Sequence, residues 1–239
     1  MERKKHLLIV LMIMGISIVA SSQYRTRIYE AYASGDMKQW KELIHEMDRS
    51  KNQQSAFVLE LINYQYGYIG WCLGTNRKDE AKYWMEKMEK NMELLEKRKH
   101  QPATIEAYRA ALIGYKIGLN RARAPFIGSR SIEHAKEAIR LDSSNPMGFI
   151  QYGHILFYTP GLFGGSRDES ISNYLSAEKK MLAQGVEKDW NYLSLLTSIA
   201  ESYHKMGEKS KALQYLDKAL KAEPAFQWVK KELYPKYSK

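Results

Sequence analysis

The stretch that decides the fold is Leu193–Pro224, LSLLTSIAESYHKMGEKSKALQYLDKALKAEP. Apolar and small side chains recur in it at steps of three and four residues on both sides of Gly207: Leu196, Ile199, Ala200 and Tyr203 before it, and Ala212, Leu216 and Ala219 after it. Such spacing predicts two amphipathic helices, with a break at Gly207 and an end at Pro224. Because neither helix is long enough to bury its apolar face alone, they must pack on each other and on neighbours.

The spacing resembles a tetratricopeptide repeat (TPR), a helix–turn–helix unit of about 34 residues. The small residues that let the two helices approach closely fall at Ala200, Ala212 and Ala219, and the closing proline falls at Pro224. Leu196 departs mildly from the family pattern, which often has Trp there. The resemblance implies an array of stacked helix pairs with a concave groove.

Weaker copies of this pattern precede it in Pro146–Gln184, Ala107–Ser143, Ile62–Leu95 and Tyr24–Ser50. The closing segment AFQWVKKELY has the composition of a capping helix, which repeat arrays need. We therefore predict an all-α, right-handed solenoid of about five antiparallel helix pairs plus a C-terminal capping helix. Residues 23–100 form degenerate pairs, and residues 101–239 form TPR-like repeats with two lengthened internal loops, as one continuous domain.

The N-terminus has the three parts of a secretory signal peptide. Basic residues precede a 14-residue apolar run, LLIVLMIMGISIVA, and Ala20-Ser21-Ser22 precede the predicted cleavage before Gln23. At about 1.5 Å per residue the run covers roughly 21 Å, short of the ~30 Å hydrocarbon core of a membrane. We expect residues 1–22 to be removed and the protein to be exported, periplasmic or in the cell envelope of a bacterium. A retained membrane anchor is the alternative.

The net charge limits the classes of partner, and the cysteine content limits the possible disulfides. The net charge is +10, and removing residues 1–22, with three basic residues and one acidic one, lowers it to +8. This charge is compatible with acidic partners or with peripheral association with a membrane surface, whereas export argues against nucleic acid. The lone Cys72 excludes an intramolecular disulfide and is expected to be a buried packing residue.

The loop Pro160–Arg167, PGLFGGSR, has glycines but lacks the spacing and the preceding strand of a phosphate-binding loop. We interpret it as an insertion between two helices, closed by a capping box in which Ser166 begins the next helix and Glu169 completes it. A related interruption, APFIGSRS, is predicted at Ala124–Ser131. Both carry a Gly-Ser-Arg sequence.

Equivalent turns of a repeat array lie on one edge, so the two insertions are expected to form a ridge. It consists of Phe126, Arg130, Phe163 and Arg167. The arginines and helix starts there suit an anion or a partner carboxylate. We favour the alternative in which the phenylalanines plug the end of the repeat core and the serines only cap helices.

Catalytic and metal-binding patterns are not apparent. No two of the six histidines lie three or four residues apart, so a helix-face zinc pair is excluded, and no nucleophile elbow occurs. We predict a protein that is not an enzyme and holds no cofactor.

Surface recognition remains. In TPR proteins, four first-helix positions of each repeat line the concave groove. The resemblance places at them Tyr108, Tyr115, Ile150, His154, Phe157, Thr197, Glu201 and His204. Our main hypothesis is an exported scaffold or adaptor that binds a protein or peptide there, although tyrosines on this face are also compatible with ordinary packing. The alternative is a small-ligand or solute-transport accessory protein that uses the paired Gly-Ser-Arg loops. The oligomeric state stays open.

Overall fold

A computed structural model describes residues 23–239. The predicted signal peptide lies outside the described residues. The elements are helical residues 23–34, α2 (Met37–Arg49), α3 (Ser55–Gly74), α4 (Lys78–Lys97), α5 (Pro102–Leu119), the short 3-10 helix η1 (Arg121–Arg123), α6 (Ala124–Leu141), α7 (Pro146–Tyr158), the 3-10 helix η2 (Gly161–Phe163), α8 (Arg167–Gln184), α9 (Trp190–Lys205), α10 (Lys209–Ala222), the π-helical turn η3 (Val229–Leu233) and α11 (Tyr234–Ser238).

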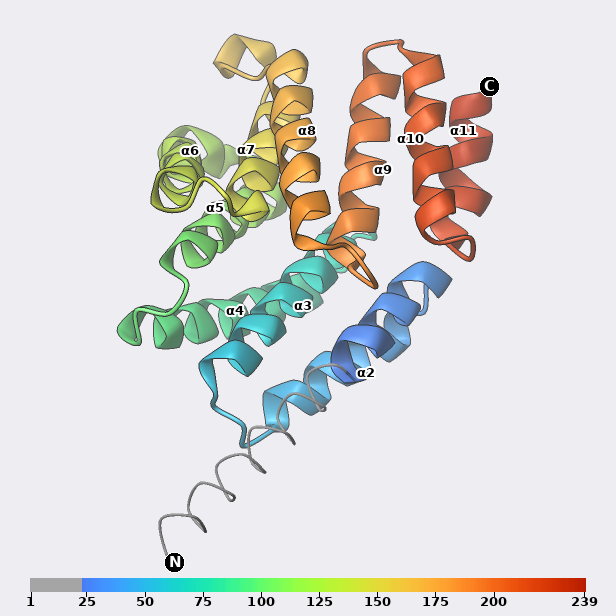
Figure 1. Cartoon of the computed structure of the whole chain (residues 1–239). Helices are drawn as coiled ribbons and strands as arrows, with labels where there is room; N and C mark the ends of the chain where they lie inside the picture. Colours follow the sequence, from blue (N-terminus) through green and yellow to red (C-terminus); the bar gives the residue numbers. More distant parts are fainter. Residues whose placement is uncertain (1–22) are drawn as a thin grey trace, which may run out of the picture.

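Consecutive helices pack as five antiparallel pairs, followed by the C-terminal helix (Figure 1). Residues 23–34 pair with α2, α3 with α4, α5 with α6, α7 with α8, and α9 with α10. The predicted fold class, stacked antiparallel helix pairs with a cap, is confirmed. One cluster of buried side chains runs through the whole array, from Ile28 to Tyr237.

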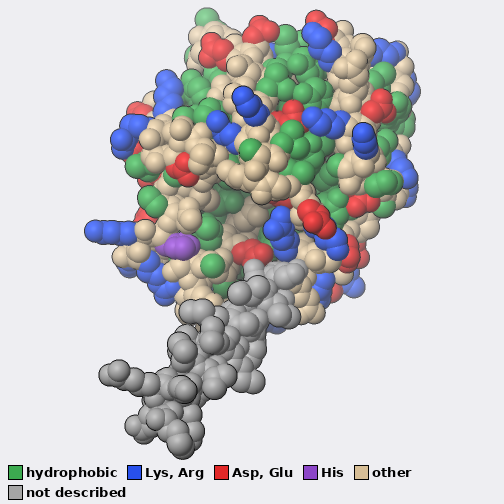
Figure 2. Space-filling model, viewed as in Figure 1, with side chains coloured by type: hydrophobic (Ala, Val, Ile, Leu, Met, Phe, Trp, Pro, Cys, Tyr) green, Lys and Arg blue, Asp and Glu red, His purple; other side chains and the backbone are tan. Residues whose placement is uncertain are grey.

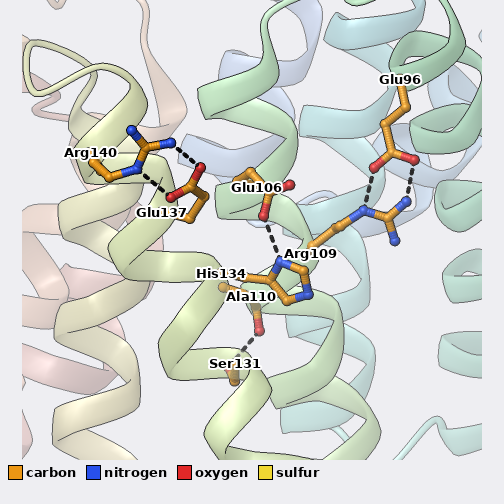
Figure 3. A network of polar contacts seen from close by, with 8 residues as sticks. All are labelled: Glu96, Glu106, Arg109, Ala110, Ser131, His134, Glu137 and Arg140. Carbon is orange, nitrogen blue, oxygen red and sulfur yellow. Dashed lines mark hydrogen bonds and ion pairs between the residues drawn. The ribbon is translucent and has the colours of Figure 1, made fainter.

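Close approach within a pair depends on small residues and buried serines. In the fourth pair, Ser170 Oγ donates to the Gly153 carbonyl at 2.8 Å, and a Cβ added to Gly153 would lie 2.5 Å from the Tyr174 ring. In the third pair, Ser131 Oγ donates to the Ala110 carbonyl at 2.9 Å (Figure 3). A larger side chain at these positions would push the paired helices apart.

Polar contacts join the third pair to its neighbour and its two helices to each other. Arg109 on α5 makes a bidentate ion pair with Glu96 on α4, and His134 Nδ1 on α6 lies 2.5 Å from Glu106 Oε2 on α5 (Figure 3). All four side chains are partly exposed, so these contacts fix register more than they add stability.

The helix ends follow local rules. Gly207, with φ +80°, ends α9, and the Glu208 N–H bonds the Tyr203 carbonyl at 2.9 Å, which satisfies a terminal carbonyl. In the cap, Pro235 lacks an N–H and its ring crowds the carbonyl four residues before it. The π-helical turn η3 precedes this proline, and the helix continues through it as α11.

One predicted loop is wrong. Ala124–Ser131 is the start of α6, not an insertion, and the chain reverses at Asn120–Arg123 instead. Pro125 lies in the first turn of α6, where a missing N–H costs nothing and the fixed φ favours the helix. Gly128 is accommodated inside the helix, with nothing within 4 Å of an added Cβ.

The array curves until its two ends meet. Helical residues 23–34 lie beside the start of α9 and the turn after α10, so the first pair closes against the last (Figure 1). The rings of Tyr32 and Phe226 are 5.3 Å apart, and Arg25 Nη2 donates to the Glu187 carbonyl at 3.0 Å. This closure determines which part of the concave face stays accessible.

Candidate functional site

The eight predicted groove residues divide into two sets. The buried ones are Tyr108, Ile150 and Thr197. The partly exposed ones are Tyr115, His154, Phe157, Glu201 and His204. On α5, α7 and α9 alike, the buried positions are those nearer the start of the helix. One half of the predicted groove is therefore closed, and the other half is open.

The closed half is filled by aromatic side chains of the N-terminal pairs. Trp190, the first residue of α9, has ring centroids of three such side chains around it: Trp40 at 5.0 Å, Tyr32 at 5.6 Å and Tyr66 at 6.1 Å. The Trp40 indole N–H also donates to the Tyr64 carbonyl at 3.0 Å. Buried aromatic groups of this size contribute much of the packing energy of a core. We call these four rings the aromatic hub.

A glycine lets the hub form. A Cβ added to Gly67 on α3 would lie 2.6 Å from Trp190 Cη2 and 2.8 Å from Trp40 Cζ2. Both distances are far below the separation of packed carbon atoms, about 3.5–4.0 Å. The two indoles therefore lie directly against the backbone of α3.

Two of the predicted groove tyrosines form hydrogen bonds to α3. Tyr108 OH donates to Asn63 Oδ1 at 3.0 Å, and Tyr115 OH donates to the Tyr66 carbonyl at 3.0 Å. The rings of Tyr66 and Tyr115 stack at 5.7 Å. These tyrosines thus hold the protein's own chain, which is the packing alternative considered for them.

The open half contains an exposed tyrosine that the repeat frame does not predict. Tyr158, the last residue of α7, is 71% exposed, and its ring lies 4.9 Å from that of Phe157. Desolvation by the surrounding protein atoms and the nearby Glu201 carboxylate raise the pKa of Tyr158. The sequence signal that could have identified Tyr158 is its position directly after the predicted groove residue Phe157.

His154 lies between α7, α8 and α9. Its ring makes an edge contact with Tyr174 at 5.3 Å, and its Nε2 lies 3.5 Å from Ser198 Oγ. Burial lowers the pKa of His154 to about 4, so the imidazole is neutral at neutral pH. A small cavity of about 10 Å³ beside it, with room for about one water, separates it from the aromatic hub at Tyr66.

The far wall is formed by α9 and the cap. The His204 ring stacks on Tyr237 of α11 at 4.0 Å. Glu201, one turn earlier, takes part in no ion pair within residues 23–239. We define the open half of the groove by His154, Phe157, Tyr158, Glu201 and His204.

The predicted ridge residues lie on two different kinds of structure. Phe126 and Arg130 lie on α6, whereas Phe163 ends η2 and Arg167 begins α8. Phe126 is 81% exposed and Phe163 is 73% exposed, so the preferred interpretation, in which they plug the repeat core, is wrong.

The predicted capping box is half formed. Ser166 Oγ accepts from the Glu169 N–H at 3.2 Å, but the Ser166 N–H donates to the Leu156 carbonyl at 3.1 Å. The loop therefore folds back on the end of α7. Arg167 Nη1 reaches the Lys205 carbonyl at 3.0 Å, which ties the start of α8 to the end of α9.

A separate polar cleft of about 340 Å³ lies where α3 meets the starts of α5, α7 and α9. Its wall contains no Lys or Arg, and its polar members are Asn63, Gln101, Tyr108, Asp142, Asn145, Gln184, Asp189 and Asn191. Several of them already cap helices: Asn145 Oδ1 accepts from the Met147 N–H and Asp189 Oδ1 from the Asn191 N–H, each at 2.9 Å. No motif or spacing in the sequence predicts this cleft.

Within residues 23–239 no cluster of three or more His, Cys, Asp or Glu side chains is arranged to hold a metal ion. None of the helices in this range is long and apolar enough to cross a membrane. Cys72 is buried on α3, where burial raises the pKa of its thiol to about 12.

Pairs of antiparallel helices with small residues at their contacts, stacked in chain order and closed by a cap, decide the fold. This arrangement is the fold class predicted from the sequence. Among solved structures, the HusA haemophore from Porphyromonas gingivalis is similar, with a TM-score of 0.63 at 17% identity over 77% of this chain and 93% of that chain. A thermophilic TPR protein from Thermus thermophilus matches with a TM-score of 0.48 at 18% identity over 94% of both chains.

No protein-family model matches the chain, and no curated protein matches its sequence.

Proposed function

We propose that the protein is an exported TPR-type scaffold that binds an extended segment of another protein on the open half of its groove. The observation that carries this proposal is the pair of neighbouring rings of Phe157 and Tyr158 at the end of α7, with Tyr158 71% exposed. We call this pair the aromatic step. Aromatic side chains that are already ordered make good anchors because little conformational entropy is lost on binding.

The charge of the open half narrows the chemistry of the partner. Glu201 is the acidic group of this surface, and it has no ion-pair partner within residues 23–239. His154 is neutral, because burial lowers its pKa to about 4. We therefore propose a partner segment with apolar side chains for the aromatic step and one Lys or Arg for Glu201.

Site-specific photo-crosslinking in intact cells tests this proposal. A crosslinker placed at His204 should capture a specific partner. Capture should fall at least tenfold in the Phe157→Ala/Tyr158→Ala variant, because each ring supplies an anchor of 1 kcal/mol or more, as estimated for typical interface hot spots. Tyr83→Ala, which removes an exposed ring from α4, is the matched control and should leave capture unchanged.

Two outcomes would reject the groove as the site. One is equal capture by the wild type and the Phe157→Ala/Tyr158→Ala variant. The other is capture that Tyr83→Ala lowers as much. Glu201→Gln separates the charge from the aromatic anchors, and it should weaken capture without abolishing it.

Export is part of the proposal. Its support is the basic start, the 14-residue apolar run and the small residues before Gln23. Mass spectrometry of the protein from the cell envelope should give a chain that begins at Gln23. A chain that keeps residues 1–22 would favour the membrane anchor instead.

A second candidate function is carriage of a small ligand, favoured by the 340 Å³ cleft with its amide and carboxylate groups. That volume is in the range of small-molecule sites. The structural neighbour named a haemophore shows that this fold occurs in a haem carrier. Native mass spectrometry of the freshly purified protein, followed by titration with haem, tests this candidate. An apo mass together with no absorbance change on titration would count against it.

A further inference from the structure

The turn between α5 and α6 carries basic side chains without acidic ones. On the face shown in Figure 2, acidic and basic side chains are interspersed. From Glu106 to Glu133, in contrast, the chain has no acidic residue, and this stretch contains Arg121, Arg123 and Arg130. All three arginines are exposed, and none takes part in an ion pair within the described residues. Three guanidinium groups are thus available to an anionic partner.

Apolar side chains protrude beside them. Phe126, between these arginines, is 81% exposed. On the connection between α7 and α8, Leu162 is 90% exposed and Phe163 is 73% exposed. Single exposed apolar residues are ordinary, but side chains this large at the tips of adjacent turns leave apolar surface for a partner to cover.

The α7–α8 connection holds its apolar tip in a defined shape. Gly164 has φ +90°, and a Cβ added to Gly165 would lie 1.7 Å from the Thr159 carbonyl oxygen. The Ser166 N–H bonds the Leu156 carbonyl. Because the loop is folded tightly onto the end of α7, its backbone would lose little conformational entropy when the exposed Leu162 and Phe163 contact a partner.

Both segments lie on the same edge of the array. They are the turns inside two consecutive helix pairs, α7 packs on both α5 and α6, and equivalent turns of stacked pairs lie next to each other. We call the surface formed by Phe126, Leu162, Phe163 and Arg121, Arg123 and Arg130 the turn edge.

We propose that the turn edge docks on an anionic lipid bilayer, with the apolar side chains inserted between headgroups and the arginines at the phosphates. The turn edge shares no residue with the open half of the groove, so it adds a membrane location to the proposed scaffold. The side chains protrude from different turns instead of lining a pocket. A bilayer accommodates such projections, whereas a protein partner needs a complementary shape. The arginines supply charge complementarity to anionic headgroups.

Vesicle co-sedimentation with residues 23–239 tests the proposal. This segment contains the helix pairs and the buried cluster, and it lacks the apolar N-terminal run that would itself bind lipid. The protein should sediment with vesicles that contain phosphatidylglycerol and much less with pure phosphatidylcholine. Added salt should weaken the binding.

Two variants remove the two contributions. Each basic residue near an anionic surface contributes about fivefold to binding, so replacing Arg121, Arg123 and Arg130 by Ser should weaken it by roughly a hundredfold. Leu162→Ser/Phe163→Ser should weaken binding by about tenfold or more. All the replaced side chains are exposed, so the circular dichroism melting curves should match that of the wild type.

Matched controls change the same chemistry elsewhere. Replacing the exposed Lys51, Lys97 and Lys221 by Ser removes the same charge near the other ends of the pairs. Leu141→Ser/Leu182→Ser removes exposed leucines near the C-terminal ends of α6 and α8. Both controls should keep most of the binding.

Failure of the wild type to bind anionic vesicles would overturn the proposal. So would controls that lose as much binding as the turn-edge variants, because binding would then reflect net charge or general hydrophobicity. Capture of a protein through the turn edge without vesicle binding would also overturn it. The groove proposal is tested by Phe157→Ala/Tyr158→Ala, which leaves the turn edge intact, so the two failures are distinguishable.

Discussion

Replacing Gly67 by Ala tests the closure of the groove with a single methyl group. The new Cβ would lie 2.6 Å from Trp190 Cη2 and 2.8 Å from Trp40 Cζ2, so both indoles would have to move by roughly 1 Å to reach ordinary contact. Overpacking of this kind costs about 1–3 kcal/mol. Ala is favoured over Gly inside a helix by about 1 kcal/mol. The expected net effect is a loss of up to about 2 kcal/mol in the free energy of unfolding, whereas helix propensity alone would give a gain.

The chain supplies a control for the same substitution. Gly114 lies inside α5, is exposed, and has nothing within 4 Å of an added Cβ. Gly114→Ala should therefore stabilise the protein by up to about 1 kcal/mol through helix propensity alone. Urea unfolding followed by circular dichroism measures both effects, and Tm should move by about 2–4 °C per kcal/mol for a domain of this size.

A smaller ring at position 190 completes the test. If the clash is with the Trp190 indole, Trp190→Phe should cost less in the Gly67→Ala background than in the wild type. If Gly67→Ala instead stabilises the protein as Gly114→Ala does, the N-terminal pairs do not pack against α9 and the closed half of the groove is open.

Three other predictions concern buried groups. Burial lowers the pKa of His154 from 6.5 to about 4, so the unfolded chain takes up a proton at this imidazole before the folded protein does as the pH falls. The free energy of unfolding should therefore drop by up to about 3 kcal/mol between pH 6.5 and 4. In urea titrations His154→Gln should lose this part of the pH dependence. Cys72 is buried and the pKa of its thiol is raised to about 12, so a maleimide should label the folded protein far more slowly than the urea-unfolded protein. Fast labelling of the folded protein would show that α3 is exposed. Lys218 Nζ lies 2.6 Å from Oε1 of the buried Glu178, so Lys218→Ala should destabilise the protein by about 1–3 kcal/mol and the double variant Lys218→Ala/Glu178→Gln by less. Thermal melts measure both losses, and equal losses would show that the two charges are not coupled.

The helix pairs were predictable from the sequence because their determinants are local. The stripe around Leu196 and Leu216, the glycine at 207 and the proline at 224 act within a few residues of themselves, and each has the predicted effect. The misplaced loop at Ala124–Ser131 had a local signal as well. Pro125 favours the start of a helix, whereas the Gly-Ser-Arg sequence after it resembles the loop before α8 and favours an insertion.

The closure of the groove was not predictable in the same way. Trp190 contacts Trp40 and Tyr66, which are far away in sequence, and the repeat frame describes only neighbouring pairs. How sharply the array curves depends on long-range fits such as the indoles against Gly67. Tyr108 and Ile150 therefore occupy the predicted groove positions and are nevertheless buried, while Tyr158 lies outside the frame and is exposed.

The most direct test of the account is a nuclear Overhauser measurement between Gly67 and Trp190 in solution. The position of the Trp190 ring against the α3 backbone predicts cross-peaks between the Gly67 Hα protons and the indole ring protons of Trp190. Their presence would show that the N-terminal helix pairs close half of the groove and leave His154, Phe157, Tyr158, Glu201 and His204 as the open half. Their absence, in a protein whose Gly153 and Tyr174 protons do show cross-peaks, would contradict the closed array.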